Sequence, residues 1–100
     1  MENNEMYVEG YKKYDEVYAI CIDDKKEGNP TVIAKATVVG DVSYRYDYNC
    51  LALHFADMED DDWLELDTAF IAPTKKEILK KLRKQIDELE KLYEEESKNG

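Results

Sequence analysis

Apolar residues recur at steps of three and four over the last quarter of the chain, a spacing typical of a helix with one apolar side. We therefore predict one long amphipathic helix over residues 74–98. Thr74 and Glu77 fit a capping box, which places the start of the helix after Pro73. Residues 94–100 hold no apolar side chain, so we expect that end of the helix to fray. The predicted apolar seam consists of Ile78, Leu79, Leu82, Ile86, Leu89, Leu92 and Tyr93.

Before the helix, the apolar residues come in short runs rich in β-formers, separated by polar turns. They predict strands over residues 17–22, 31–39, 42–56 and 63–71. The order strand, strand, strand, strand, helix predicts an α+β fold, with an antiparallel meander of about four strands and the C-terminal helix packed across one face. We interpret residues 1–100 as a single domain. Residues 1–14 read as a loosely ordered, extended arm or a short strand.

The segment 42–56 is open to two interpretations. Tyr44, Tyr46 and Tyr48 alternate with polar residues, which is the pattern of a half-buried strand. The apolar positions then change parity, which a β-bulge near Asn49 and Cys50 would produce. The alternative is a helix that carries Tyr44 and Tyr48 on one side. The alternation and the β-propensity of tyrosine favour the strand.

The net charge of −10 changes this picture most. Residues 1–72 hold 17 acidic and 6 basic side chains, whereas residues 73–100 hold 7 acidic and 8 basic ones. All the excess negative charge therefore belongs to the part of the chain before the helix. Such a surface repels nucleic acid and anionic membranes and attracts basic proteins.

The charges of the helix itself are divided between its two halves. Residues 75–84 carry six cations, and residues 87–96 carry six carboxylates and a single lysine. The helix macrodipole favours the reverse order by about 0.3–1 kcal/mol per well-placed charge. We therefore expect the basic half to be selected by another interaction, and the acidic remainder of the same chain is the simplest candidate.

The most acidic stretch, residues 57–67, holds seven carboxylates and no cation. Read as an EF-hand loop from Asp57, it would place Asp62 where the sharp turn needs glycine and Thr68 where a bidentate glutamate belongs. A looser calcium site, a merely solvated loop and a deliberate presentation of negative charge stay open as interpretations. We expect no metal site here.

His54, the only histidine, follows Cys50 by four positions. The pair supplies two of the four ligands of a structural zinc site, and Cys21 alone does not complete the set. A Cys–His nucleophile would need an oxyanion-type turn that the sequence beside Cys50 lacks. A structural histidine and two reduced thiols are the favoured interpretation. No phosphate-binding loop is present, so we expect neither a cofactor nor an enzymatic activity.

These observations favour an acidic interaction or inhibitor protein that binds the basic, nucleic-acid-binding surface of a partner and does not itself bind nucleic acid. In size and charge alone it is similar to phage inhibitors of host nucleases, including some anti-CRISPR proteins that mimic DNA, and to immunity proteins. The alternative is a small accessory or regulatory domain that forms a homodimer through its helix or a sheet edge. With no apolar run of membrane-spanning length and no secretory signal, we expect a cytoplasmic protein. The candidate partner-binding residues are Tyr44, Tyr46, Tyr48, Asp57, Glu59, Asp60, Asp61, Asp62, Trp63, Glu65 and Asp67.

Overall fold

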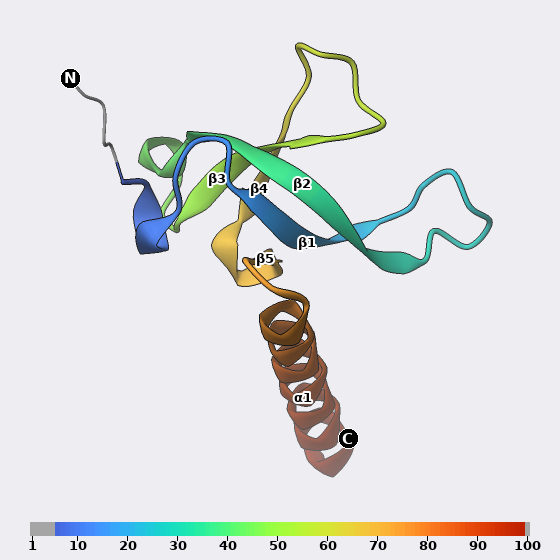
Figure 1. Ribbon diagram of the computed structural model, residues 1–100. Helices are drawn as coiled ribbons and strands as arrows, with labels where there is room; N and C mark the ends of the chain where they lie inside the picture. Colours follow the sequence, from blue (N-terminus) through green and yellow to red (C-terminus); the bar gives the residue numbers. More distant parts are fainter. Residues whose placement is uncertain (1–5, 100) are drawn as a thin grey trace.

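A five-stranded antiparallel sheet and one long C-terminal helix make up the computed structural model, which describes residues 6–99 and, of these, the side chains of residues 6–94 (Figure 1). The α+β prediction is confirmed, with five strands in place of about four. Three short 3-10 turns, η1 to η3, lie between the strands. In chain order the elements are η1 Val8–Gly10, β1 Glu16–Ile22, β2 Thr31–Asp41, η2 Ser43–Arg45, β3 Cys50–Phe55, β4 Leu64–Asp67, η3 Thr68–Phe70, β5 Ile71–Ala72 and α1 Lys75–Asn99.

The sheet has the order β4-β3-β2-β1-β5, so the first four strands form the predicted meander and β5 pairs with the free edge of β1. This order forces the sheet to curl. The outer strands of a flat five-stranded sheet lie about 19 Å apart. Only three residues, Thr68–Phe70, join β4 to β5, and such a connection spans at most about 14 Å. The two edges of the sheet are therefore drawn towards each other.

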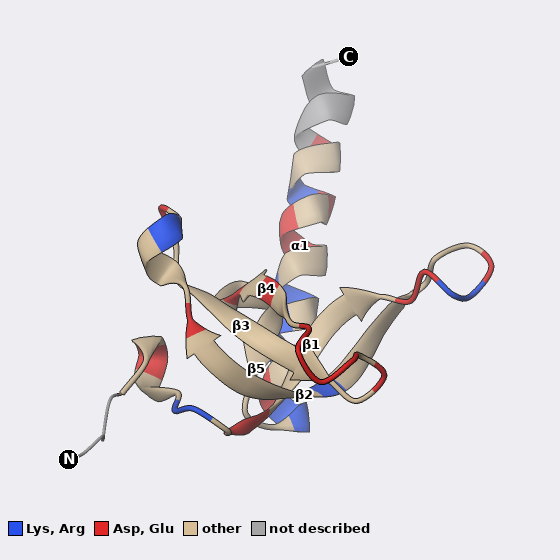
Figure 2. Cartoon of the chain, turned by 90° about the horizontal axis from the view of Figure 1, so that it is seen from above, with Lys and Arg blue, Asp and Glu red and all other residues tan. Residues whose placement is uncertain are grey.

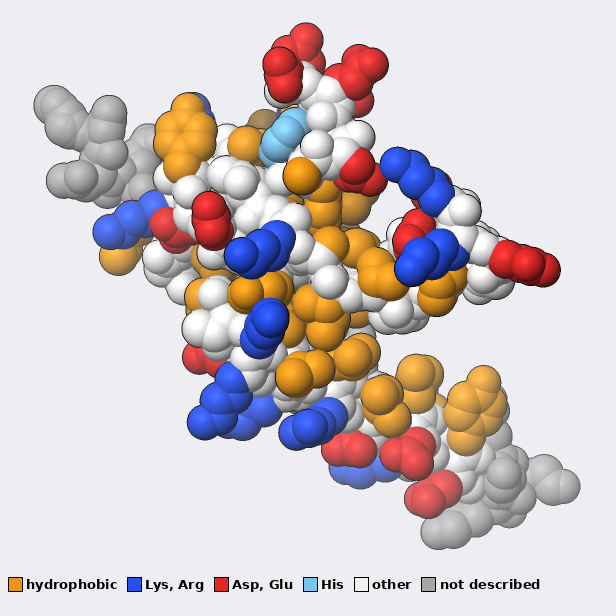
Figure 3. Space-filling model, turned by 45° about the vertical axis from the view of Figure 1, so that its right-hand side comes forward, with side chains coloured by type: hydrophobic (Ala, Val, Ile, Leu, Met, Phe, Trp, Pro, Cys, Tyr) orange, Lys and Arg blue, Asp and Glu red, His pale blue; other side chains and the backbone are white. Residues whose placement is uncertain are grey.

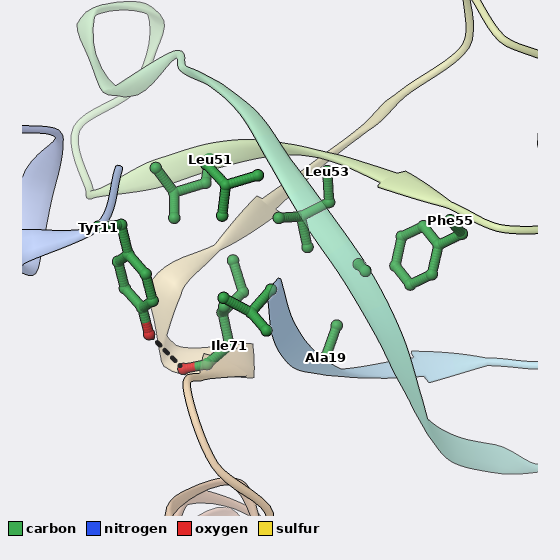
Figure 4. Packing of buried hydrophobic residues seen from close by; sticks show 9 residues of the cluster. Tyr11, Ala19, Leu51, Leu53, Phe55 and Ile71 are labelled. Carbon is green, nitrogen blue, oxygen red and sulfur yellow. Dashed lines mark hydrogen bonds between the residues drawn. The ribbon is translucent and has the colours of Figure 1, made fainter. Parts of the chain in front are cut away.

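The curled sheet encloses the main core. Leu51, Leu53 and Ile71 are fully shielded from solvent and lie beside Ala19 and Phe55 (Figure 4). These five residues come from β1, β3 and β5, so the core connects interior strands of the sheet to its edge strand β5. β2 contributes Ala36 and Val38. A register shift between Val38 and Gly40 lets β2 bend over this core.

The N-terminal segment closes one end of the core. Tyr11 is 6% exposed, and its hydroxyl donates to the carbonyl of Ile71 at 3.4 Å (Figure 4). Burial, followed by the charge of Glu9, raises the pKa of Tyr11 to about 12. Glu9 accepts hydrogen bonds from the Thr68 hydroxyl and, at 3.1 Å, from the Asn49 amide. Residues 1–5 of the predicted arm lie outside the described residues.

Helix α1 begins as its sequence predicts and packs against the sheet by its first turns. The Thr74 hydroxyl accepts from the Glu77 amide at 3.2 Å, which is half of the predicted capping box. Ile78 is fully buried against Ile20 and Ala72, and Leu82 is half-buried beside them. Beyond these turns the helix projects from the sheet (Figure 1), and the molecule measures 58 × 30 × 27 Å.

Most of the predicted apolar seam is therefore exposed to solvent. Leu79, Ile86 and Leu89 are 42, 48 and 55% exposed, and Leu92 and Tyr93 are 59 and 68% exposed. The helical period correctly grouped these residues on one side, but of them only Ile78 and Leu82 pack against the sheet. Helix α1 extends to Asn99, and the expected fraying of residues 94–100 stays a prediction.

The basic half of α1 contacts the body mainly through Lys81. Its ammonium group donates to the carbonyls of Thr68 at 2.8 Å and Ile71 at 2.6 Å. Within the described part of the chain, the ion pairs closer than 4 Å are Lys25–Asp57 and Arg45–Glu65, and neither involves the helix. The expected direct pairing of helix lysines with acidic residues of the body is therefore not seen there, because the lysine that reaches the body meets backbone carbonyls.

Replacing Lys81 with methionine should lower the free energy of unfolding by about 1–2 kcal/mol, because two partly buried carbonyls lose a charged donor. Lys84→Met, at an exposed position of the same helix, is the matched control and should change stability by less than about 0.5 kcal/mol. Urea unfolding of both variants measures the difference. Equal effects of the two substitutions would show that Lys81 does not anchor the helix.

Two strand predictions need correction. Residues 42–49 are not a strand: Tyr44 lies in η2, and Tyr46 and Tyr48 lie in the connection to β3. The Ser43 side chain exchanges hydrogen bonds with the backbone of Cys50, and Asp41 accepts from the Ser43 amide, so this segment is a hairpin connection. The predicted strand over residues 63–71 is broken by η3 into β4 and β5.

Candidate protein-interaction surface

The loop that joins β3 to β4 is the most strongly charged feature of the surface. We call residues 57–62 the acidic loop (Figure 2). Two backbone hydrogen bonds fold it into turns, from the Met58 amide to the carbonyl of Phe55 at 3.0 Å and from the Asp62 amide to that of Glu59 at 2.9 Å. All five of its carboxylate side chains are exposed: Asp57, Glu59, Asp60, Asp61 and Asp62. The loop therefore presents its charge to solvent.

His54 fixes the end of this loop. Its Nδ1 lies 2.9 Å from the carbonyl oxygen of Asp62, so this nitrogen carries the proton and donates. His54 and Cys50 both lie on β3, four residues or about 13 Å apart along the strand. That separation is too long for the two side chains to form a nucleophilic pair, and it favours the structural interpretation of His54. Among residues 6–94, no three metal-ligating side chains gather into a group that could hold an ion.

Asp57 is the one carboxylate of the acidic loop with a described ion-pair partner. The ammonium group of Lys25, on the β1–β2 connection, lies 3.2 Å from it. Both side chains are about two-thirds exposed, so solvent and salt screen the pair and it contributes little to stability. Glu59, Asp60, Asp61 and Asp62 make no ion pair within the described residues.

Next to the acidic loop, Glu65 of β4 gathers side chains from two segments that are about twenty positions apart in the sequence. Arg45 pairs with it at 2.7 Å, the indole of Trp63 donates to it at 3.3 Å, and the Tyr46 hydroxyl donates to its other oxygen. Tyr46 stacks on Tyr48 with 5.1 Å between ring centres. The guanidinium of Arg45 lies 5.4 Å from the centre of the Tyr44 ring. We call Tyr44, Arg45, Tyr46, Tyr48 and Trp63 the aromatic cluster.

The electrostatics of the aromatic cluster depend on Glu65. Hydrogen bonds from Tyr46 and Trp63, aided by the charge of Arg45, lower the pKa of the Glu65 carboxyl. The same carboxylate raises the pKa of Tyr46 to about 12. Glu65 therefore stays ionised, and Tyr46 stays protonated, across the physiological range. The cluster is held together by one acceptor, the Glu65 carboxylate, while its rings remain exposed, with Tyr44 78% and Trp63 53% accessible.

Acidification should loosen the aromatic cluster. Because the pKa of Glu65 is lowered on folding, the stabilisation is complete above the unfolded value of about 4.3 and is lost as the pH falls through the lower, folded value. Trp63 is the only tryptophan, so its fluorescence reports the loss. We expect a fluorescence transition below about pH 4.3 in the wild type that Glu65→Gln abolishes. Circular dichroism over the same range separates it from global unfolding, and an identical transition in Glu65→Gln would contradict the assignment.

The structure thus divides the eleven candidate residues into three groups. The acidic loop and the exposed rings of the aromatic cluster are available to a partner. Glu65 is occupied in organising the cluster. Asp67 accepts from the Ala69 amide at 2.8 Å and caps η3, so its role is local. Arg45 was missed, because nothing in its spacing reveals that it meets Glu65 twenty positions later.

The chain matches no family model, no curated protein and no solved structure. Over the described residues, no helix has both the length and the apolar character needed to cross a membrane.

Proposed function

We propose that this chain is a non-enzymatic interaction protein that binds the basic, nucleic-acid-binding surface of another protein and thereby inhibits it. The acidic loop takes the place of nucleic-acid phosphates, and the aromatic cluster supplies the contact area. The observation that carries the proposal is the continuity of the two features: the exposed carboxylates end at Asp62, and the exposed indole of Trp63 follows directly and is tied to the tyrosines through Glu65.

The two features contribute differently to binding. Exposed charges accelerate encounter with an oppositely charged surface, and each contributes little affinity alone. Tyrosine, tryptophan and arginine are the residue types that most often carry the binding energy of an interface. In the proposed complex the acidic loop therefore sets the association rate, and the aromatic cluster sets the dissociation rate.

The cysteines bear on where this binding would take place. Cys21 and Cys50 are free thiols, and burial raises the pKa of each, which lowers the fraction present as the reactive thiolate. Reduced structural cysteines suit a reducing compartment. We therefore propose that the protein acts in the cytoplasm.

Capture experiments test the proposal. Wild-type protein and an acidic-loop variant, Asp60→Asn with Asp61→Asn and Asp62→Asn, are immobilised and exposed to a lysate of the source cell. We expect the wild type to retain basic nucleic-acid-binding proteins that added duplex DNA releases, and the variant to lose them. The same proteins retained by both, or proteins that DNA does not release, would contradict the proposal.

A charge-matched variant serves as control. Glu16→Gln, Asp24→Asn and Glu27→Gln also remove three exposed carboxylates, but from β1 and the β1–β2 connection. Both variants have the same net charge, so a general effect of charge would weaken capture equally. A specific role of the acidic loop predicts that the control variant behaves like the wild type.

A further inference from the structure

An open groove lies between α1 and the curled sheet. None of the residues that line it belongs to the aromatic cluster. Its volume is about 1320 Å³. Its apolar lining includes Ile22, Leu64 and Leu66 from the strands and Leu82, Ile86 and Leu89 from the helix. Figure 3 shows hydrophobic side chains on the sheet and a further row of them along one side of the helix. A contiguous exposed apolar surface of this kind marks an interaction site.

The charges on α1 indicate what occupies this surface. The exposed cations Lys76, Lys80 and Arg83 lie in the first half of the helix, and the exposed carboxylates Asp87 and Glu90 lie in the second half. The body of the same chain does not account for this division, because among the described basic residues of α1 only Lys81 bonds to it and its acceptors are carbonyls. A second helix with the same division, running in the opposite direction, sets its acidic half beside the basic half of the first, and of these residues Arg83 and Glu90 lie next to the seam.

We propose that a second copy of this chain docks on the seam, with its α1 antiparallel to that of the first. Arg83 and Glu90 lie seven residues apart, two turns, and so share one edge of the seam. A two-fold axis midway between them places Arg83 of each copy opposite Glu90 of the other. Ile86 and Leu89, which flank that midpoint, then meet the same residues of the second copy.

The groove enlarges the contact beyond the two helices. The exposed seam from Leu79 to Tyr93 spans only about 21 Å, which is short for an isolated coiled coil. In the antiparallel arrangement residues 84–91 of each helix lie opposite the stretch from Leu82 to Leu89 of the other copy, which lines its groove. The charges that line the groove are balanced, so they do not repel the incoming helix: Asp23, Asp24 and Asp57 against Lys25, Lys26 and Lys35.

Analytical ultracentrifugation of the full chain tests this inference. We expect the mass to rise with concentration from 11.7 kDa to twice that value. Leu89→Asp places a charge in the seam of each copy and should hold the protein at the monomer mass with its circular dichroism unchanged, because Leu89 is 55% exposed in the single chain. A mass of 11.7 kDa at every concentration would overturn the proposal. Unfolding of the Leu89→Asp monomer would also overturn it, because that result would show that Leu89 packs against the sheet of its own chain.

Charge exchange tests the antiparallel direction. Arg83→Glu and Glu90→Arg each replace two attractive pairs by two repulsive ones, so each variant should raise the dimer dissociation constant on the order of tenfold. The double variant restores both pairs and should dimerise like the wild type. Lys84→Glu makes the same charge change about 100° further around the helix, away from the seam, and is the control.

The pattern of these four variants decides between arrangements. A parallel dimer sets Arg83 against Arg83, so Arg83→Glu would leave its dissociation constant unchanged, and that result overturns the proposal. Equal weakening by Lys84→Glu and Arg83→Glu also overturns it, since net charge would then be responsible. The groove shares Asp57 and Met58 with the acidic loop, but the inference rests on the helix seam and stands independently of the proposed function.

Discussion

Leu53→Ala should cost about 2–5 kcal/mol of the free energy of unfolding, the largest effect that we expect of any single substitution in this chain. Leu53 is fully buried on the interior strand β3, between β4 and β2, and belongs to the core that the curled sheet encloses. The truncation removes three heavy atoms and leaves a cavity between strands that cannot collapse independently. A small domain has only about 5–15 kcal/mol of stability in all. Urea unfolding followed by circular dichroism measures the loss.

Ile86→Ala is the matched control. It also removes three side-chain carbon atoms, but from a residue of α1 that is 48% exposed. Measured at a protein concentration low enough to exclude dimers, it should cost less than about 1 kcal/mol. A loss as large as that of Leu53→Ala would show that the seam packs on the sheet in solution and would contradict the projecting helix.

Removing three charges from the acidic loop should slow association with a basic partner about tenfold at low salt. Asp60, Asp61 and Asp62 are exposed and make no described ion pair, so their replacement by asparagine keeps side-chain size and leaves the fold intact. The dissociation rate should change less, because the aromatic cluster is untouched. Stopped-flow mixing with a captured partner measures both rates.

Trp63→Ala provides the complementary control for that experiment. The indole is 53% exposed and donates to Glu65, so its loss removes contact area rather than charge. Association should proceed at the wild-type rate and dissociation should accelerate. If the acidic-loop variant and Trp63→Ala changed the same rate constant, the division of roles between the two features would be wrong.

The secondary structure was predictable where local chemistry decides it. Thr74 and the apolar spacing after it give α1, and the β-rich runs give β1, β2 and β3. The alternation of Tyr44, Tyr46 and Tyr48 misled the prediction, because Asp41 and Ser43 capture backbone groups and turn the chain before Cys50. A period of two indicates a strand only where no side chain competes for the backbone.

The sequence could not show which part of the molecule covers the apolar side of α1. The period of α1 shows that Ile78, Leu82, Ile86 and Leu89 share one side, and only the short link through η3 reveals where the sheet ends. Curling reduces the sheet surface that is available to the helix. The helix therefore extends beyond the sheet after about two turns. The sheet order has the same origin, since the pairing of β5 with β1 depends on tertiary closure.

The sequence predicted the charge of the candidate site, but not which of its side chains contact one another. Five carboxylates within six residues at a turn between two strands had to be exposed, because the sequence offers them no neighbouring cation. The role of Glu65 depends on side chains that folding brings to it from a distant segment, and the role of Asp67 depends on the local turn η3. Arg45 and Tyr46 reach Glu65 across twenty and nineteen positions, and His54 reaches the carbonyl of Asp62 across a loop.

The salt dependence of association tests the central claim, that the acidic loop binds as a substitute for phosphate groups. The rate for wild type and a captured basic partner, measured between about 50 and 500 mM salt, should fall steeply as screening increases. The rate for the triple asparagine variant should start lower and fall less, so that the two converge at high salt. Rates that do not change with salt, or parallel curves for the two proteins, would contradict the claim.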